Sequence, residues 1–321
     1  MATLDEKISF GDNVRHIIET PECTVFQLLD ESGEGTMTLY NIFDGAYMMV
    51  NDMHLTSCVS HFKQHDGSQL LCIDHCREGR IENEIADGAY CYLQEHELRV
   101  DNRHHHSGPV SLPLCHYHGI TLTFDLPPAT ASLKGFFGGF SVDLYALADK
   151  YCDDARPFVI HSNPGIEHIF SELYHVPQKI KADYLKVKAL ELLLYLDALE
   201  ISDAKEARPY FYKSQVEKIK AIHALITADL ERHYTMEALA ERFQISLTAM
   251  KTCFKEIYGD SMYSYLKRYR MNVAASMLRQ SPDRSVADIA GAVGYESPSK
   301  FATAFRQVMG QSPMAYRKSF F

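Results

Sequence analysis

The sequence predicts an α+β protein of more than one domain, because different parts of the chain follow different patterns. At 321 residues the chain is longer than one small hydrophobic core usually serves. Short apolar runs bounded by Gly, Pro, Asp and Asn fill residues 1–127, which is typical of the strands of a sandwich or small barrel. Residues 128–200 and 214–321 instead follow the 3.6-residue period of amphipathic helices.

The strand-rich part ends at Pro127-Pro128, where helices are expected to begin. Within it, the segment 75–80 contains Gly79 and predicts a hairpin turn. In the helical region over 128–200, the apolar residues of the segment 183–199 recur close to a 3.6-residue period. That helix is predicted to pack on the β-domain, to form a dimer interface, or to do both.

A linker is predicted at residues 201–213, because this segment interrupts the helical period. An all-α domain is expected over 214–321. Ser214 and Glu217 fit a capping box at the start of its first helix.

Bulk features predict a cytoplasmic protein without a membrane segment. No run of about 18 apolar residues is present, and residues 1–7 carry acidic side chains where a secretory signal needs an apolar core. The eight cysteines include no pair with CxxC spacing. In this setting they are expected to be reduced thiols.

Charge is distributed unevenly along the chain. Residues 1–216 carry 17 basic and 32 acidic side chains, a formal charge of −15, whereas residues 217–321 carry 15 and 10, a charge of +5. An acidic body with a basic C-terminal domain suits a protein that binds DNA with one end only. An imbalance of this size also arises by chance, so charge alone leaves both explanations open.

The C-terminal domain contains an internal repeat, in which residues 235–268 resemble residues 285–319. Matching positions carry side chains of the same kind at nearly constant spacing. They are Leu239 with Ile289, Ala240 with Ala290, Phe243 with Val293, Ile245 with Tyr295, Ser246 with Ser297, Met250 with Phe301, Phe254 with Phe305, Lys255 with Arg306, Gly259 with Gly310 and Tyr265 with Tyr316.

Each matched position has a structural reason in a helix-turn-helix unit. A small residue such as Ala240 lets the second helix cross the first closely, and an apolar residue such as Ile245 fills the turn. Ser246 is a good N-cap for the second helix, and Gly259 suits its C-terminal left-handed cap. Ordinary paired helices of a bundle are the alternative, but two copies with matching caps and turns favour helix-turn-helix units. Joined by one helix, they could reach successive major-groove segments about 34 Å apart.

Over residues 217–318 the sequence resembles the AraC family of bacterial transcription regulators. The most specific match is Ser285-Val286-Ala287-Asp288-Ile289-Ala290, Val293-Gly294-Tyr295, Ser299-Lys300-Phe301, Phe305 and Gly310-Gln311-Ser312-Pro313-Met314-Ala315-Tyr316-Arg317. Tyr295 stands where Phe is usual in the family. Lys300 stands where an aromatic residue is commoner, and in this the sequence resembles a sub-branch similar to siderophore-responsive regulators. The resemblance implies sequence-specific binding of double-stranded DNA and contact with RNA polymerase. It also implies a cupin-like N-terminal barrel that binds a small-molecule effector or forms a homodimer.

DNA contacts are expected from the residues that follow the cap of each second helix. Lys251 and Lys300 can donate to guanine O6 and N7, whereas Lys255 and Arg306 are better placed for phosphates. The full predicted set is Thr248, Ala249, Lys251, Thr252 and Lys255 in the first unit, and Pro298, Ser299, Lys300, Thr303 and Arg306 in the second. For each lysine, a solvated surface charge is the alternative.

The N-terminal half is rich in histidine, which raises the question of a metal. His116 and His118 share one strand face, but no HxH with a following Glu at strand spacing is evident. The favoured interpretation is therefore that these histidines form hydrogen bonds within the protein or are solvated, and no metal or cofactor is predicted. The others considered are His54, His61, His65, His75, His96 and His104–His106.

Three functions remain open from the sequence. The favoured one is a dimeric transcription regulator modulated by a small molecule. A constitutive regulator whose N-terminal domain only dimerises is the second, and a cupin-type metalloenzyme fused to a DNA-binding domain is the third. The sequence contains no catalytic triad, Walker loop or Rossmann fingerprint, so no catalytic residue is predicted and an enzyme is not expected.

Overall fold

The computed structural model describes residues 8–9, 13–58, 63–64, 69–85, 89–103, 106–136, 140–152, 157–201, 211–281 and 283–319. The chain divides into two compact units, unit 1 over Met1–Tyr210 and unit 2 over Phe211–Phe321. Most of the linker predicted at 201–213 lies outside the described residues.

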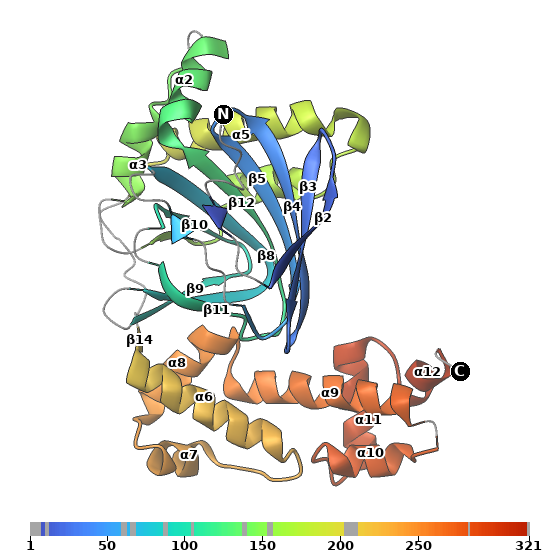
Figure 1. The fold of residues 1–321 in the computed structure, drawn as a ribbon. Coiled ribbons are helices and arrows are strands. Elements are labelled where there is room, and N and C mark those ends of the chain that lie inside the picture. Colours follow the sequence, from blue (N-terminus) through green and yellow to red (C-terminus); the bar gives the residue numbers. More distant parts are fainter. Residues whose placement is uncertain are drawn as a thin grey trace. The chain divides into compact units, whose positions relative to one another are not determined.

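Unit 1 is built on a large antiparallel sheet (Figure 1). Neighbouring strands pair in the order β13-β10-β8-β12-β5-β4-β3-β2, while β9 and β11 pair with β8, and β6 pairs with β11. β1 and β7 form a separate two-stranded sheet. The strands of this unit are β1 (Ile8–Ser9), β2 (Val14–Glu19), β3 (Cys23–Asp30), β4 (Gly33–Phe43), β5 (Ala46–His54), β6 (Ser57–Cys58), β7 (Lys63–Gln64), β8 (Leu70–Ile85), β9 (Ala89–Gln94), β10 (Glu97–Asp101), β11 (His106–Ser111), β12 (Tyr117–Asp125) and β13 (Phe158–Ile160).

The long strand β8 changes partners at Gly79. Before this residue β8 pairs with β10 and β12, and from Arg80 onward it pairs with β9 and β11. Gly79 has φ +87°, and a Cβ there would lie 2.2 Å from the carbonyl oxygen of His116, so only glycine fits. The hairpin predicted at 75–80 is therefore wrong, because the chain continues through a β-bulge as one strand.

The strand path of unit 1 is open. β13 and β2 stand at its two ends, and no pairing between described residues joins them into a ring. The expected antiparallel β-domain is present, but the predicted cupin-like closed barrel is not confirmed.

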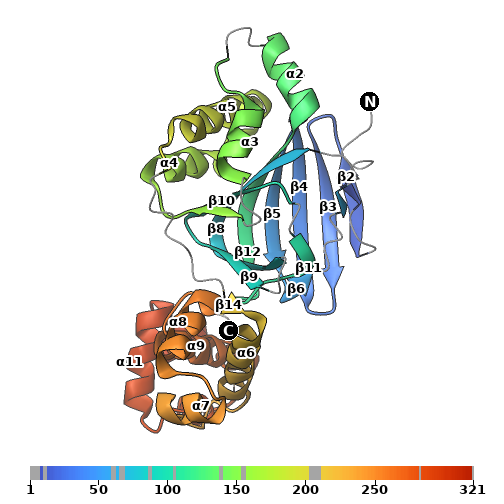
Figure 2. The same ribbon diagram turned by 90° about the vertical axis from the view of Figure 1, so that its left-hand side faces the viewer.

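Helices cover one face of this sheet (Figure 2). Met48 of β5 and Leu122 of β12 share a buried cluster with Leu192 and Leu193, two residues of the predicted apolar helix. The prediction of helices throughout 128–200 needs one correction, since β13 interrupts them and pairs with β10. The helices are α2 (Leu126–Phe136), α3 (Leu144–Cys152), α4 (Pro164–Leu173), the 3-10 turn η2 (Gln178–Ile180) and α5 (Lys181–Ala198). Among all described helices of the chain, none is both long and apolar enough to cross a lipid bilayer.

Unit 2 is helical apart from a two-residue strand at its start, as the sequence predicts. The first helix begins at Lys213 with Tyr212 at the N-cap position and no side-chain capping bond, so the capping box of Ser214 and Glu217 does not form. Its elements are β14 (Phe211–Tyr212), α6 (Lys213–Ala228), α7 (Met236–Arg242), α8 (Leu247–Tyr258), α9 (Met262–Gln280), α10 (Val286–Ala292), α11 (Pro298–Met309) and α12 (Pro313–Lys318).

Candidate nucleic-acid interface

Helices α7 and α8 form the first predicted helix-turn-helix unit. The Thr235 side chain caps α7, and Ser246 Oγ accepts a hydrogen bond of 3.2 Å from the backbone N–H of Ala249 at the start of α8. In the turn between the helices, the N–H of Ile245 donates to the carbonyl oxygen of Ala240 over 3.0 Å. The preceding residue, Gln244, adopts a left-handed conformation with φ 49°.

Helices α10 and α11 repeat this construction. Ser285 caps α10, and Ser297 Oγ accepts a hydrogen bond of 3.4 Å from the N–H of Lys300 at the start of α11. In the turn, the N–H of Tyr295 donates to the carbonyl oxygen of Ala290 over 2.9 Å, as Ile245 does to Ala240 in the first unit. The residue that matches Gln244 is a glycine in this copy. The two units therefore share their backbone hydrogen bonds as well as their sequence pattern.

The second helix of each unit is held by its apolar side. Met250 and Phe254 of α8 are fully buried, and so are Phe301 and Phe305 of α11. In both copies a glycine in the left-handed conformation ends the helix, Gly259 with φ 82° and Gly310 with φ 75°. Packing and caps together leave the opposite side of each helix free for a ligand.

The ten predicted contact residues all lie on these two helices, on the sides that face away from the core. Ala249 is half-buried, and the other nine residues are exposed. On α11 the Thr303 hydroxyl donates to the backbone carbonyl of Ser299, so it is engaged within the helix. The structure thus groups the predicted residues as two exposed faces, with Lys251 near the middle of α8, Lys300 in the first turn of α11, and a basic residue toward the end of each helix.

The connecting helix α9 carries a buried cation that the sequence pattern did not reveal. Arg270, which is 8% exposed, donates from Nη2 to the carbonyl oxygen of Leu230, between α6 and α7, over 2.7 Å. A Cβ at Gly294, in the turn of the second unit, would lie 2.1 Å from the same carbonyl oxygen. In the sequence, the only sign of this contact is that Arg270 stands beside the apolar positions of the connecting helix.

A second polar residue packed into unit 2 is the half-buried His223 on α6. Its ring stacks on Tyr258 with centroids 4.3 Å apart, and its Nε2 lies 2.8 Å from the Tyr265 hydroxyl. Burial lowers the pKa of His223 to about 4. The imidazole is therefore neutral near pH 7, and the tyrosine hydroxyl can donate to it.

Several histidines of unit 1 have hydrogen-bond partners within the protein, which is the interpretation that the sequence analysis favoured. His75 Nε2 and His96 Nδ1 contact the two carboxylate oxygens of Glu167 at 3.0 and 2.8 Å. Burial lowers the pKa of His75, whereas hydrogen bonds from both histidines hold the pKa of Glu167 below its usual value despite partial burial. His61, His65, His104 and His105 lie outside the described residues, and nothing is described of the His106 side chain.

Buried charges line the other face of the unit 1 sheet. Arg99 donates from Nη2 to Asp74 Oδ2 over 2.8 Å, and Arg103 donates to Asp74 Oδ1 over 2.6 Å. The Thr121 hydroxyl donates to the same Oδ1 at 2.8 Å. Although burial opposes it, the two guanidinium groups hold the pKa of Asp74 below its usual value. The polar interior of this unit is thus an ionic network, which strand alternation alone did not predict.

Comparison with known proteins bears on unit 2 in particular. A family model described as a helix-turn-helix domain matches residues 239–319. The chain is 28% identical over 194 residues to a putative AraC-like transcription regulator of Streptomyces antibioticus, with 56% of this chain and 62% of the relative covered. It is also 28% identical over 141 residues to the HTH-type transcriptional activator RhaR of Pectobacterium carotovorum, with 44% of this chain and 49% of the relative covered.

Among solved structures, the chain is similar to the DNA-binding domain of AdpA, a global transcriptional factor that was crystallised with a target DNA. That match is 29% identical, covers 32% of this chain and 92% of that one, and has a TM-score of 0.31. The chain spans less than two thirds of the length of the two relatives named above, 62% and 49%. Residues 239–319 therefore form a helix-turn-helix domain, and the chain is similar to AraC-like transcription regulators.

Proposed function

We propose that the protein is a transcription regulator that binds double-stranded DNA in a sequence-specific way through α8 and α11. The observation that carries this proposal is the duplicated unit, in which two helices with the same caps and turns each expose a polar, basic face. A helix placed in this way against its partner is the element that enters the major groove in helix-turn-helix proteins. The formal charge of +5 on residues 217–321 supports attraction to phosphates.

The contact residues follow from the exposed faces. Lys251 and Lys300 read base edges, and guanine O6 and N7 are the acceptors that suit an ammonium donor. Lys255 and Arg306, which lie further toward the C-terminal ends of the same helices, bind phosphates and set the register of the helices on the duplex. The remaining members of the proposed contact set are Thr248, Ala249, Thr252, Pro298, Ser299 and Thr303.

Unit 1 is proposed to form a homodimer and to bind a small-molecule effector in a cupin-like interior. Exposed Val187 and Leu194 on α5, at 59% and 45% exposure, support an apolar contact between copies. In this account the protein acts in the cytoplasm and contacts RNA polymerase. The motif around Lys300 further supports a place in a sub-branch similar to siderophore-responsive regulators.

The proposal is tested by incubating the protein with sheared DNA from its source organism and sequencing the recovered fragments. Upstream regions that share a motif should be enriched. On such a fragment, Lys300→Ala should weaken binding by about 1–3 kcal/mol. Lys134→Ala on α2 is the matched control, since Lys134 is an exposed lysine of unit 1 outside α5, and it should leave affinity unchanged. The experiment is done with the whole chain alone and with the whole chain plus an extract of the source organism, which could supply an effector. Absence of enrichment in both cases would contradict the proposal.

A further inference from the structure

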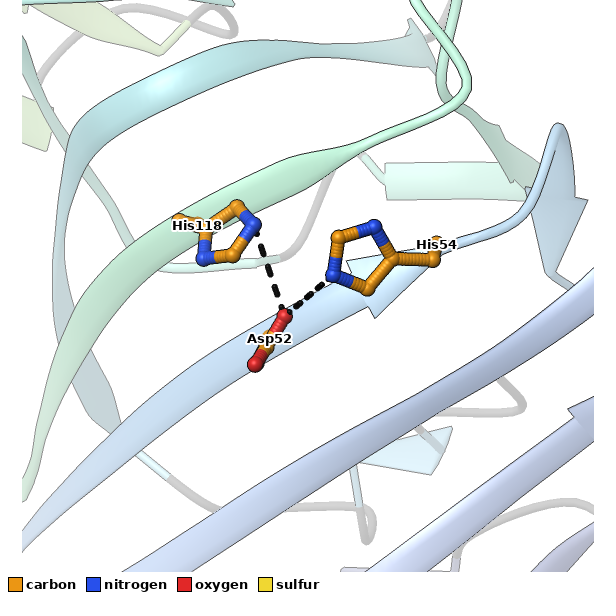
Figure 3. A group of neighbouring side chains, drawn as sticks. All are labelled: Asp52, His54 and His118. Atoms are coloured by element: carbon orange, nitrogen blue, oxygen red, sulfur yellow. Dashed lines mark ion pairs between the residues drawn. The ribbon is translucent and has the colours of Figure 1, made fainter. Parts of the chain in front are cut away.

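Three metal-ligating side chains of unit 1 converge on one point of the sheet surface (Figure 3). Asp52 and His54 lie near the end of β5, and His118 lies near the start of β12. Asp52 Oδ1 is 2.9 Å from His54 Nε2 and 3.4 Å from His118 Nε2. One ligand atom from each residue lies within 4.8 Å of the other two.

Strand register creates this convergence. His118 pairs directly with Asp52 across the antiparallel β5–β12 ladder, so their side chains leave the same face of the sheet. His54 is two residues beyond Asp52 and shares that face because side chains alternate along a strand. Met48, further along β5, is on the same face but under the helices. The cluster therefore occupies the part of the outer face that stays open to solvent, with its three side chains 29–59% exposed.

Hydrogen bonding does not account for the arrangement. Asp52 Oδ1 is buried and accepts no hydrogen bond from a described residue, although two imidazole nitrogens lie close to it. Buried polar atoms normally have a partner. Zinc bonds of about 2.0–2.1 Å place the ligand atoms of a tetrahedral site about 3.3 Å apart. Both measured separations from Asp52 Oδ1 are close to this value.

We propose that Asp52, His54 and His118 bind one zinc ion on the outer face of unit 1, with water completing its coordination. Two imidazole nitrogens and one carboxylate oxygen are a donor set that zinc takes in proteins, with the fourth position left open. The ion would tie the end of β5 to the start of β12. Because it would bind only the folded sheet, it should raise the melting temperature of unit 1.

The test is a zinc titration of the reduced, metal-free full chain in competition with a chromophoric chelator. Wild type is compared with His54→Ala, His118→Ala and the near-isosteric Asp52→Asn. His168→Ala is the matched control, since His168 is 69% exposed on α4 outside the cluster. Wild type and His168→Ala should bind one zinc ion that each cluster variant binds about tenfold more weakly or not at all.

Circular dichroism separates loss of a ligand from loss of the fold. In metal-free buffer all variants should melt at the wild-type temperature, because the substituted side chains are partly exposed. Zinc should then raise the melting temperature of wild type and of His168→Ala only. Equal zinc stoichiometry, affinity and thermal shift in wild type and in correctly folded cluster variants would overturn the proposal, since zinc would then bind elsewhere on the chain.

Discussion

Gly294 lies in the turn of the second helix-turn-helix unit, close to the carbonyl oxygen of Leu230, and its replacement by alanine tests this contact. The residue has φ +80°, and an added Cβ would lie 2.1 Å from the Leu230 carbonyl oxygen. That oxygen accepts the hydrogen bond from Arg270. A methyl group therefore has to displace backbone, and the displacement breaks a bond to a buried cation.

Two contributions set the size of the effect. A left-handed conformation costs a residue with a Cβ about 1–2 kcal/mol, and loss of a hydrogen bond to a charged group costs about 1.5–3 kcal/mol. Gly294→Ala should therefore lower the free energy of unfolding of unit 2 by roughly 3–5 kcal/mol. Gly310→Ala meets only the first cost, because φ is +75° there but no atom lies within 4 Å of the added Cβ. Gly291→Ala, inside α10 and equally unhindered, should stabilise by about 0.5–1 kcal/mol.

Urea denaturation of the full chain followed by circular dichroism gives the free energies of the three variants. Hydrogen exchange read on peptides from α10 and α11 assigns the change to unit 2. From most to least stable, the expected order is Gly291→Ala, wild type, Gly310→Ala and Gly294→Ala. A cost for Gly294→Ala no larger than that for Gly310→Ala would refute the steric argument and the role of the Arg270 bond.

Three further perturbations have defined outcomes. An unfolded chain protonates a histidine near pH 6.5, but the folded unit 2 protonates His223 only near pH 4. The free energy of unfolding should therefore fall by about 1.4 kcal/mol for each unit by which the pH is lowered between these values. His223→Phe should remove that part of the slope in urea denaturation, and equal slopes would contradict the burial argument. Arg99→Met removes one of the cations around buried Asp74 and should cost unit 1 about 3–5 kcal/mol in the same assay; an unchanged midpoint would show that the remaining partners suffice. Ser246→Ala removes the cap of α8 and should cost about 1 kcal/mol, seen as faster exchange of its first-turn amides, whereas Ser246→Asp should not.

Unit 2 could be predicted from the sequence because its determinants are local. Ser246 and Ser297 cap the helices that directly follow them, and Gly259 and Gly310 end those same helices. Such contacts span a few residues and repeat in the second copy, so comparison of the copies reveals them. The failed capping box is the exception. Ser214 carries a suitable side chain, but α6 begins at Lys213, so the cap position falls on Tyr212, two residues before Ser214.

Contacts between distant residues could not be predicted in this way. The bond from Arg270 to Leu230 spans forty residues, and nothing in the local pattern indicates it. His118 and Asp52 meet only because β12 and β5 pair in one particular register. Alternation predicted that His116 and His118 share a strand face, whereas β12 begins only at Tyr117. Alternation also could not show which residue of a neighbouring strand lies opposite His118.

The shape of the unit 1 sheet depends on a similar long-range feature. Gly79 indicates a special backbone conformation, which sequence reasoning assigned to a hairpin turn. The structure places it in a continuous strand, where the close approach of the His116 carbonyl excludes a side chain. A turn and a strand position that another backbone approaches closely both favour glycine, so residue type alone does not distinguish them.

A base-resolved footprint on an enriched DNA fragment tests most directly whether both units engage the duplex. We predict protection of two major-groove segments one helical turn apart, about 10 base pairs between centres. Lys251→Ala should weaken protection at one segment and Lys300→Ala at the other. Protection of a single segment that only one of the two variants affects would contradict the account, because one unit would then be a structural copy without a role in binding DNA.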